Sequence, residues 1–189
     1  MKQPAHDSAD HELISGALNG SLSAWELLVR RYEGRVYNFS LRLTGNADDA
    51  MDLMQEVFLG VYRNLERFRG ESLFSTWLFR IAHNKAVDMA RRRGVGPPTE
   101  PVTEAQQEQA QGDDQFHPEH ELQQRQLNDQ IKRLLTQLPT DQRMTIELKF
   151  YQELTFEQIA DIEDISANTA KTRFYSAIRK LKELLENAP

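Results

Sequence analysis

The chain has 189 residues, no cysteine and a net charge of −6, and its length allows one medium domain or two small ones. The lack of cysteine excludes disulfides and thiolate metal sites and indicates a reducing compartment. No apolar run reaches membrane-spanning length, and the first residues lack the basic and hydrophobic blocks of a secretion signal, so we expect a cytoplasmic protein.

The acidic residues are concentrated in the middle of the chain. Residues 30–93 carry twelve Lys or Arg against eight acids, and residues 94–121 carry seven acids and no base. Residues 165–182 carry bases and no acid. Two basic ends therefore flank an acidic bridge, and nucleic-acid binding is compatible with the negative total.

The first 67 residues show helical patterns. A break at Asn19–Gly20 separates two helices, and a second break at Gly45–Asn46 precedes a third. The third helix carries an apolar stripe of Ala50, Leu53, Val57, Val61 and Leu65. Its acidic outer face is either solvated or a docking surface for a basic partner, and the spacing does not decide between them.

Residues 68–93 mix aromatic rings, cations and amides. The rings are those of Phe68, Phe74, Trp77 and Phe79, and Arg67, Arg69 and Arg80 lie between or beside them. Unpaired bases stack on aromatic faces, cations follow phosphates, and an exposed amide such as Asn84 can read a base edge. The same stretch also fits a core helix with an apolar face of Trp77, Leu78, Ile81 and Ala82, so the spacing leaves both interpretations open.

Residues 94 to about 120 are rich in proline, glutamine and acids and poor in apolar residues, which predicts a flexible linker. His117 and His120 suggest a metal site. Without cysteine, and with Pro118 between them, solvated histidines are the better interpretation. We therefore predict no metal and no cofactor.

Helical patterns resume at Leu122, stop at Pro139 and continue with apolar surface from Met144, Ile146, Leu148 and Phe150. Thr155 and Gln158 form a predicted capping box, and Ser166 caps a longer basic helix. A short helix, a turn and a basic helix form a helix-turn-helix, unless they are a helical hairpin with a solvated basic face. The DNA-facing candidates are Thr169, Lys171, Thr172, Arg173 and Ser176, and the packing candidates are Ile165, Ala170, Phe174, Ala177, Ile178 and Leu181.

The combination of DLMQEVF, FRGESLFSTWLFRIAHNKAVD and a helix-turn-helix led by LPTDQR resembles the extracytoplasmic-function group (group 4) of sigma-70 family RNA polymerase sigma factors. The resemblance covers nearly the whole chain. It implies an all-α fold of two small helical domains joined by a flexible linker. Residues 10–93 would form sigma region 2, residues 94–121 the linker and residues 122–187 sigma region 4.

The resemblance also implies roles for individual residues. Those for docking on core polymerase are Asp49, Asp52, Gln55, Glu56 and Phe58. Those for capture of a flipped −10 base and melting are Phe68, Arg69, Gly70, Ser72, Phe74, Ser75 and Asn84. Those for reading the −35 element are Thr169, Lys171, Thr172, Arg173, Tyr175, Ser176 and Arg179.

The implied partners are core RNA polymerase, through its beta-prime clamp helices and beta flap, promoter DNA, and an anti-sigma factor that can be membrane-bound. The linker acids would suit a cationic polymerase channel. Three departures concern −35 binding: Asp164 stands where the family commonly has glycine, Ala170 replaces a larger aliphatic residue, and Ser176 replaces a basic one. Asp tolerates the left-handed geometry of that turn.

Two other classes of protein explain the sequence less well. A self-sufficient helix-turn-helix regulator would explain residues 155–186 but leaves the aromatic loop and the acidic helix without a role. An enzyme would need clustered carboxylates or histidines, or a phosphate-binding glycine loop, and the sequence has neither. We therefore expect no enzymatic activity and no small-molecule substrate.

Overall fold

The computed structural model describes residues 4–92, 133–135 and 137–186, and side chains from Asp10 onward. Every regular element in these residues is helical, as predicted. The N-terminal helices are α1 (Pro4–Leu18), α2 (Leu22–Thr44), α3 (Ala47–Asn64), the short η1 (Leu65–Arg67) and α4 (Phe74–Arg92). The C-terminal helices are α6 (Thr140–Ile146), the π-helical turn η2 (Glu147–Tyr151), α7 (Phe156–Glu163) and α8 (Ala167–Glu186).

Local signals in the sequence set the ends of the N-terminal helices. Ser21 caps α2 by accepting a hydrogen bond from the Ala24 amide, and Gly45 ends it with φ 79°. Asn46 caps α3 by accepting a 2.8 Å bond from the Asp49 amide. The predicted breaks at Asn19–Gly20 and Gly45–Asn46 are therefore confirmed.

The N-terminal core is almost entirely apolar. The predicted stripe of α3 is buried along its whole length, from Ala50 to Leu65. It packs with Val36 and Phe39 of α2 and with Leu78 and Phe79 of α4, whose side chains are fully buried. An edge-to-face contact joins the rings of Phe39 and Phe79, with centroids 5.5 Å apart.

The C-terminal helices form a helix-turn-helix with the predicted caps. The Gln158 amide donates to the Thr155 hydroxyl, and Gln158 Oε1 accepts from the Thr155 amide, which completes the capping box. Asp164 takes the left-handed conformation, with φ 54°, that the family's glycine would take. Ser166 accepts a 3.0 Å bond from the Thr169 amide at the start of α8.

Two predicted packing residues of this part are exposed instead. Phe150 is 69% exposed and Ile178 is 42% exposed. Phe150 lies in the π-helical turn. The wider step of this turn moves Phe150 away from the buried face of the helix, on which Ile146 lies. Ile178 lies on the outer side of α8, next to Ala177, which is the residue that packs inward.

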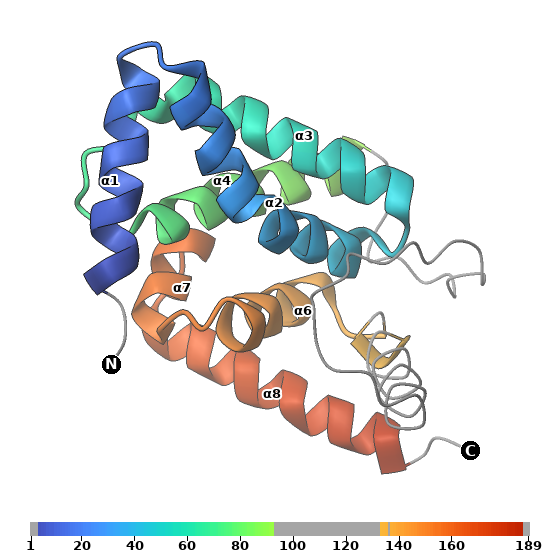
Figure 1. The fold of residues 1–189 in the computed structure, drawn as a ribbon. Helices are drawn as coiled ribbons and strands as arrows, with labels where there is room; N and C mark the ends of the chain where they lie inside the picture. The colour runs from blue at the N-terminus through green and yellow to red at the C-terminus, as the bar shows by residue number, and fades with distance from the viewer. Residues whose placement is uncertain (1–3, 93–132, 136, 187–189) are drawn as a thin grey trace, which may run out of the picture.

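The two helical units lie against each other (Figure 1), with α7 beneath α4 and α6 next to α2. One apolar cluster includes Phe39 and Leu78 from the N-terminal unit and Met144, Leu148 and Ile159 from the C-terminal unit. The predicted linker, with its acids and His117 and His120, lies outside the described residues. None of the described helices is long and apolar enough to cross a membrane.

Candidate functional site

Helix α3 presents a mixed acidic and apolar face to solvent. Asp52 and Gln55 are exposed on it, as the docking prediction requires. Phe58 is half-buried against the core, and Asp49 accepts a bond from the Asn46 amide group at the start of the helix. Glu56 forms a 3.0 Å ion pair with Lys85 of α4, and this bond lowers the pKa of Glu56.

The same face carries exposed apolar side chains that sequence reasoning did not single out. Leu59 is 47% exposed and Tyr62 is 62% exposed. Leu59 and Tyr62 continue the exposed stripe of Asp52 and Gln55 at helical spacing. This spacing is the sequence signal that could have identified them. The Tyr62 ring contacts Trp25 of α2, with centroids 5.2 Å apart. The face therefore offers apolar area flanked by carboxylate and amide groups.

The loop before α4 is anchored by an aromatic cluster. Phe68 packs on Phe74 and Trp77, with ring centroids 5.5 and 5.4 Å away. Phe74 is only 3% exposed and also contacts Tyr32 edge to face. The structure thus places Phe74 in the core, where it supports the loop and offers no free face to a base.

The remaining loop residues are accessible. Arg69, Gly70 and Ser72 are exposed, and Ser75 is half-buried. Gly70 has φ 71°, a left-handed conformation that glycine adopts without strain. The loop therefore presents a cation, backbone amides and a hydroxyl next to the half-buried ring of Trp77.

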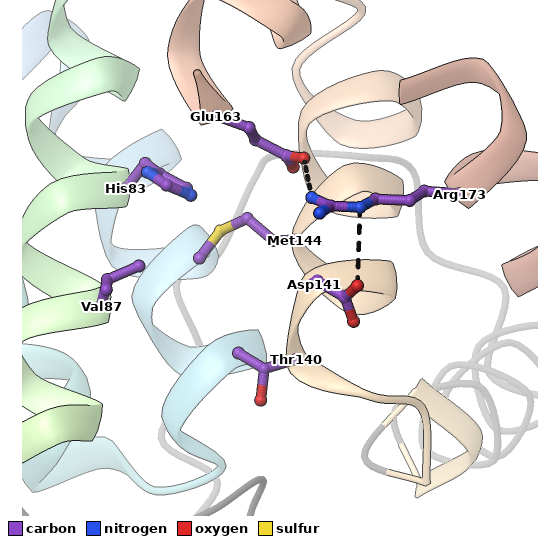
Figure 2. Close-up of a pocket in the computed structure, with 7 residues that line it drawn as sticks. All are labelled: His83, Val87, Thr140, Asp141, Met144, Glu163 and Arg173. Carbon is purple, nitrogen blue, oxygen red and sulfur yellow. Dashed lines mark hydrogen bonds and ion pairs between the residues drawn. The ribbon is translucent and has the colours of Figure 1, made fainter. Parts of the chain in front are cut away.

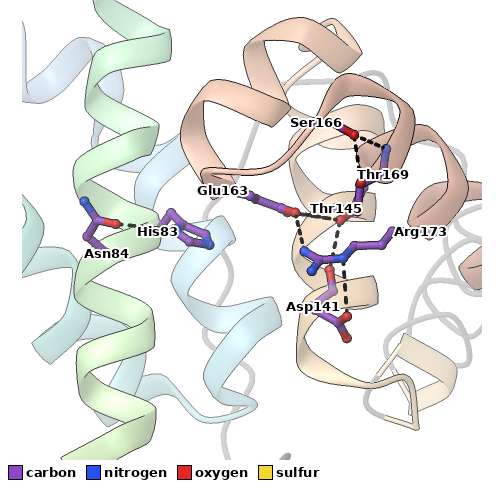
Figure 3. Close-up of polar contacts among 8 residues, drawn as sticks. All are labelled: His83, Asn84, Asp141, Thr145, Glu163, Ser166, Thr169 and Arg173. Carbon is purple, nitrogen blue, oxygen red and sulfur yellow. Dashed lines mark hydrogen bonds and ion pairs between the residues drawn. The ribbon is translucent and has the colours of Figure 1, made fainter.

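Helix α4 continues this surface away from the loop. Trp77, Arg80, Asn84, Asp88 and Arg91 recur at helical spacing, and all but Trp77 are exposed. From Trp77 to Arg91 the stripe spans about 21 Å at 1.5 Å per residue, which matches roughly six stacked nucleotides at 3.4 Å each. Asn84 points away from the C-terminal helices, and its neighbour His83 points toward them (Figure 3). Arg80 was already among the cations noted in the sequence, and Arg91 is an addition.

The outer side of α8 is basic. Thr169, Lys171, Thr172, Tyr175 and Arg179 are all exposed there. The Tyr175 ring packs edge to face on the Phe174 ring. Ser176 is half-buried and within 3.4 Å of the Gln142 amide nitrogen, so it belongs to the packing between α6 and α8.

Arg173 is separate from this outer face. Its guanidinium is 2.9 Å from Glu163 of α7 and 3.5 Å from Asp141 of α6 (Figure 3). The Thr145 hydroxyl donates to the same Glu163 carboxylate at 3.0 Å. The Glu163 side chain is 1% exposed, and this burial raises the pKa of its carboxyl group. Arg173 therefore joins three helices and holds α8 at a fixed angle to α6 and α7.

A small cavity lies between the two units (Figure 2). Its volume is about 220 Å³, and its walls come from α4, α6, α7 and α8. His83 lines it from the N-terminal unit, and burial lowers the pKa of that imidazole. The charged groups at its wall, Asp141, Glu163 and Arg173, already bond to one another. The described residues contain no group of three or more His, Cys, Asp or Glu that could hold a metal ion.

Family models match both helical units. Sigma-70 region 2 matches residues 28–95, and a sigma-70 region 4 model matches residues 128–181. The RNA polymerase sigma-H factor of Pseudomonas aeruginosa is 32% identical over 94% of each chain. The ECF RNA polymerase sigma-E factor of Haemophilus influenzae is 32% identical over 97% of this chain and 96% of its own.

Solved structures share the fold. CnrH, in complex with the cytosolic domain of CnrY, superposes with a TM-score of 0.68 at 23% identity over 96% of this chain and 99% of that one. The sigma factor RpoE of Bartonella quintana, in complex with the anti-sigma factor NepR, gives 0.68 at 22% identity over 89% of this chain and 100% of that one. The two family matches and the relatives at 32% identity show that the chain belongs to the extracytoplasmic-function group of the sigma-70 family.

Proposed function

We propose that this sigma factor binds core RNA polymerase through the exposed face of α3, opens the −10 element with the loop and outer stripe of α4, and reads the −35 element with the outer side of α8. One observation supports this most directly. A single chain carries three exposed surfaces of different chemistry, each on a separate helix. An independent regulator of the helix-turn-helix class needs only the last of them.

The α3 surface suits a protein partner. It combines the exposed rings and aliphatic groups of Tyr62 and Leu59 with the polar groups of Asp52 and Gln55. Protein interfaces commonly pair an apolar centre with a polar rim. The acids would meet a basic surface on the polymerase clamp helices, and the beta flap would meet the C-terminal unit.

The α4 surface suits a single strand. Arg69, Arg80 and Arg91 can follow phosphates, and Asn84 can bond the edge of an extruded base. Unstacking a base costs only a few kcal/mol, so a few such contacts offset it. Trp77 is half-buried, its ring packs on Phe68 and Phe74, and we propose that its exposed part contacts a base.

The α8 surface suits duplex DNA. Lys171 and Arg179 can contact phosphates or guanine edges, and Thr169 lies at the amino end that enters the groove first. Arg173 contributes by fixing the angle of α8. An anti-sigma factor is a further partner that we infer from the family, and the bacterial cytoplasm, where polymerase and promoters meet, is the expected location.

Reconstitution with purified core polymerase tests this function. We expect the chain to form a stable complex with core and to direct initiation from a subset of genomic fragments. Substitution of Gln55 and Tyr62 by alanine together should weaken the complex, whereas the exposed Asn38 of α2 serves as a control position. Absence of core binding, or tight duplex binding with no effect of core, would favour the independent regulator.

A further inference from the structure

One arginine of the proposed −35-reading helix is held inside the C-terminal unit. Arg173 lies one helical turn after Thr169 on α8, so its backbone is on the same side of the helix as a proposed DNA contact. Its side chain nevertheless points toward α6 and α7 (Figure 3) and is only 31% exposed. One guanidinium nitrogen, Nη1, donates to Oε2 of Glu163 at 2.9 Å.

Two carboxylates hold this guanidinium. The Glu163 side chain of α7 is almost completely buried, whereas the Asp141 side chain of α6 is 52% exposed and lies 3.5 Å from Arg173 Nε. Thr145 of α6 donates a further hydrogen bond to the Glu163 carboxylate at 3.0 Å. The two acids neutralise the charge of Arg173 locally. The guanidinium therefore offers little net attraction to a DNA phosphate.

Glu163 holds Arg173 more firmly than DNA would attract it. Release of Arg173 would leave the Glu163 carboxylate buried without its charged partner. Such an unpaired buried charge costs more free energy than a single base contact returns. Loss of the Asp141 contact alone matters less, because an exposed ion pair contributes little. Glu163 is therefore the group that retains Arg173.

The retention of Arg173 changes the chemistry that α8 offers to the major groove. Ser176, which lies on the same side of α8, also faces inward, 3.4 Å from the Gln142 amide nitrogen. The groups exposed near the amino end of α8, which enters the groove first, are the hydroxyls of Thr169 and Thr172 and the ammonium of Lys171. A guanidinium fork, which binds guanine through two hydrogen bonds, is missing from this end.

We propose that Glu163 determines the base preference of the −35 reader by keeping Arg173 out of the major groove. The amino end of α8 then reads the −35 element through Thr169, Lys171 and Thr172, with no base contact from Arg173. The inference rests on the proposed function. It names a specificity-determining residue that lies on a different helix from the DNA-reading side chains and acts through Arg173.

The cluster can be changed without leaving a buried polar group unpaired. Glu163→Met replaces the carboxylate with an unbranched apolar side chain that adapts to its surroundings. The Thr145 hydroxyl keeps its 2.9 Å hydrogen bond to the Asp141 carbonyl. Arg173 is already partly exposed, so its released guanidinium can turn to solvent or to DNA. We therefore expect Glu163→Met to keep the fold, which circular dichroism checks.

Selection of promoters by the full-length chain bound to core polymerase tests the proposal. A promoter from which the parent initiates is randomised in its −35 element, and the −35 sequences of the transcribed templates are read for each variant. We expect Glu163→Met to gain a preference for guanine at one position by about fivefold or more, as for one new bidentate contact. The parent should lack this preference.

Two control variants show whether Arg173 causes the change. Glu163→Met combined with Arg173→Met lacks both partners of the buried ion pair and should select the same −35 sequences as the parent. Asp141→Asn, which removes only the exposed carboxylate, should also select the parental sequences. A general disturbance of α8 would instead shift the preference of the double variant as well.

A further variant tests the parental state without removing the buried charge pair. Arg173→Lys keeps a cation beside Glu163 and should leave the base preference unchanged. A changed preference in Arg173→Lys would show that Arg173 reads a base in the parent and would overturn the proposal. So would an unchanged preference in Glu163→Met, or a new preference that persists in the double variant. These three results leave the proposed function intact, whereas a parent that directs no initiation with core polymerase would overturn the proposed function and this inference with it.

Discussion

The two helical units bury different kinds of side chain. The centre of the N-terminal unit is formed by Val36, Phe39, Leu53, Leu78 and Phe79, with no charged group among them. The C-terminal unit buries the side chains of Arg143, Glu147 and Glu163, and the first two face the other unit. Both units contribute apolar side chains to one shared cluster, whereas the buried charged groups at their contact come from the C-terminal unit.

This difference has a physical reason in the size of the units. Two of the described C-terminal helices are short, since α6 has 7 residues and α7 has 8, and they enclose little apolar volume. Charged groups that bond to one another across helices hold them together. Such groups define an arrangement well but add little net stability.

A cavity in the N-terminal core should cause the largest loss of stability and tests this difference between the two units. Phe79→Ala removes a fully buried ring that packs on Phe39. We expect a loss of about 3–5 kcal/mol in the free energy of unfolding, measured by urea titration. Leu22→Ala, at a 74% exposed position, should change it by less than about 0.5 kcal/mol. A similar small loss for both would contradict close packing around Phe79.

The second effect concerns the pH dependence of the C-terminal unit. Burial raises the pKa of Glu147 to about 7, against the opposing influence of Arg42 and Arg143, and Tyr151 lies nearby. The folded protein then binds the proton more tightly than the unfolded chain, so stability is fully present below about pH 4.5 and is lost as pH rises through about 7. The full difference is about 3 kcal/mol.

Thermal unfolding between pH 5 and pH 8 measures this effect. We expect the melting temperature to fall over this window in the parent protein, and Glu147→Gln to reduce that fall. An unchanged slope in Glu147→Gln would show that another group is responsible. A melting temperature that rises with pH would contradict the raised pKa of Glu147.

A smaller loss of stability should distinguish the two roles of basic residues on α8, which are packing and DNA contact. Arg173→Ala breaks the bond to the buried Glu163 carboxylate and should cost about 1–3 kcal/mol. Lys171→Ala, at an exposed position, should leave stability within about 0.5 kcal/mol. It should instead weaken binding of a −35 duplex and reduce the slope of affinity against salt by about one. Equal stability of the two variants would instead indicate that Arg173 faces DNA.

Most of the fold followed from local sequence signals. The stripe from Ala50 to Leu65, the capping box of Thr155 and Gln158, and the left-handed turn at Asp164 depend on neighbours within one or two helical turns. Such features are readable because helical spacing and capping are short-range. The family resemblance implied two small helical domains joined by a linker, and it did not imply that the two domains pack against each other.

The parts that the sequence did not predict depend on long-range contacts. Arg42 and Glu147 lie 105 residues apart, and nothing in either segment marks them as partners. Arg173 and Lys171 are both cations on one helix, but only the packing of α6 and α7 shows that Arg173 turns inward. Phe74 resembles an exposed ring in the sequence and is buried because Tyr32 and Phe68 cover it.

The central claim is that α4 opens promoter DNA when the chain is bound to core polymerase. Permanganate reactivity of thymines in the −10 region tests it directly, with Asn84→Ala compared with Asn38→Ala, the same substitution at another exposed helical position. We expect the parent and Asn38→Ala complexes to react, and Asn84→Ala to bind core equally well with a reactivity lower by roughly five- to a hundredfold, as for loss of one base contact. Equal reactivity of Asn84→Ala and the parent, or no reactivity in any core complex, would contradict the account.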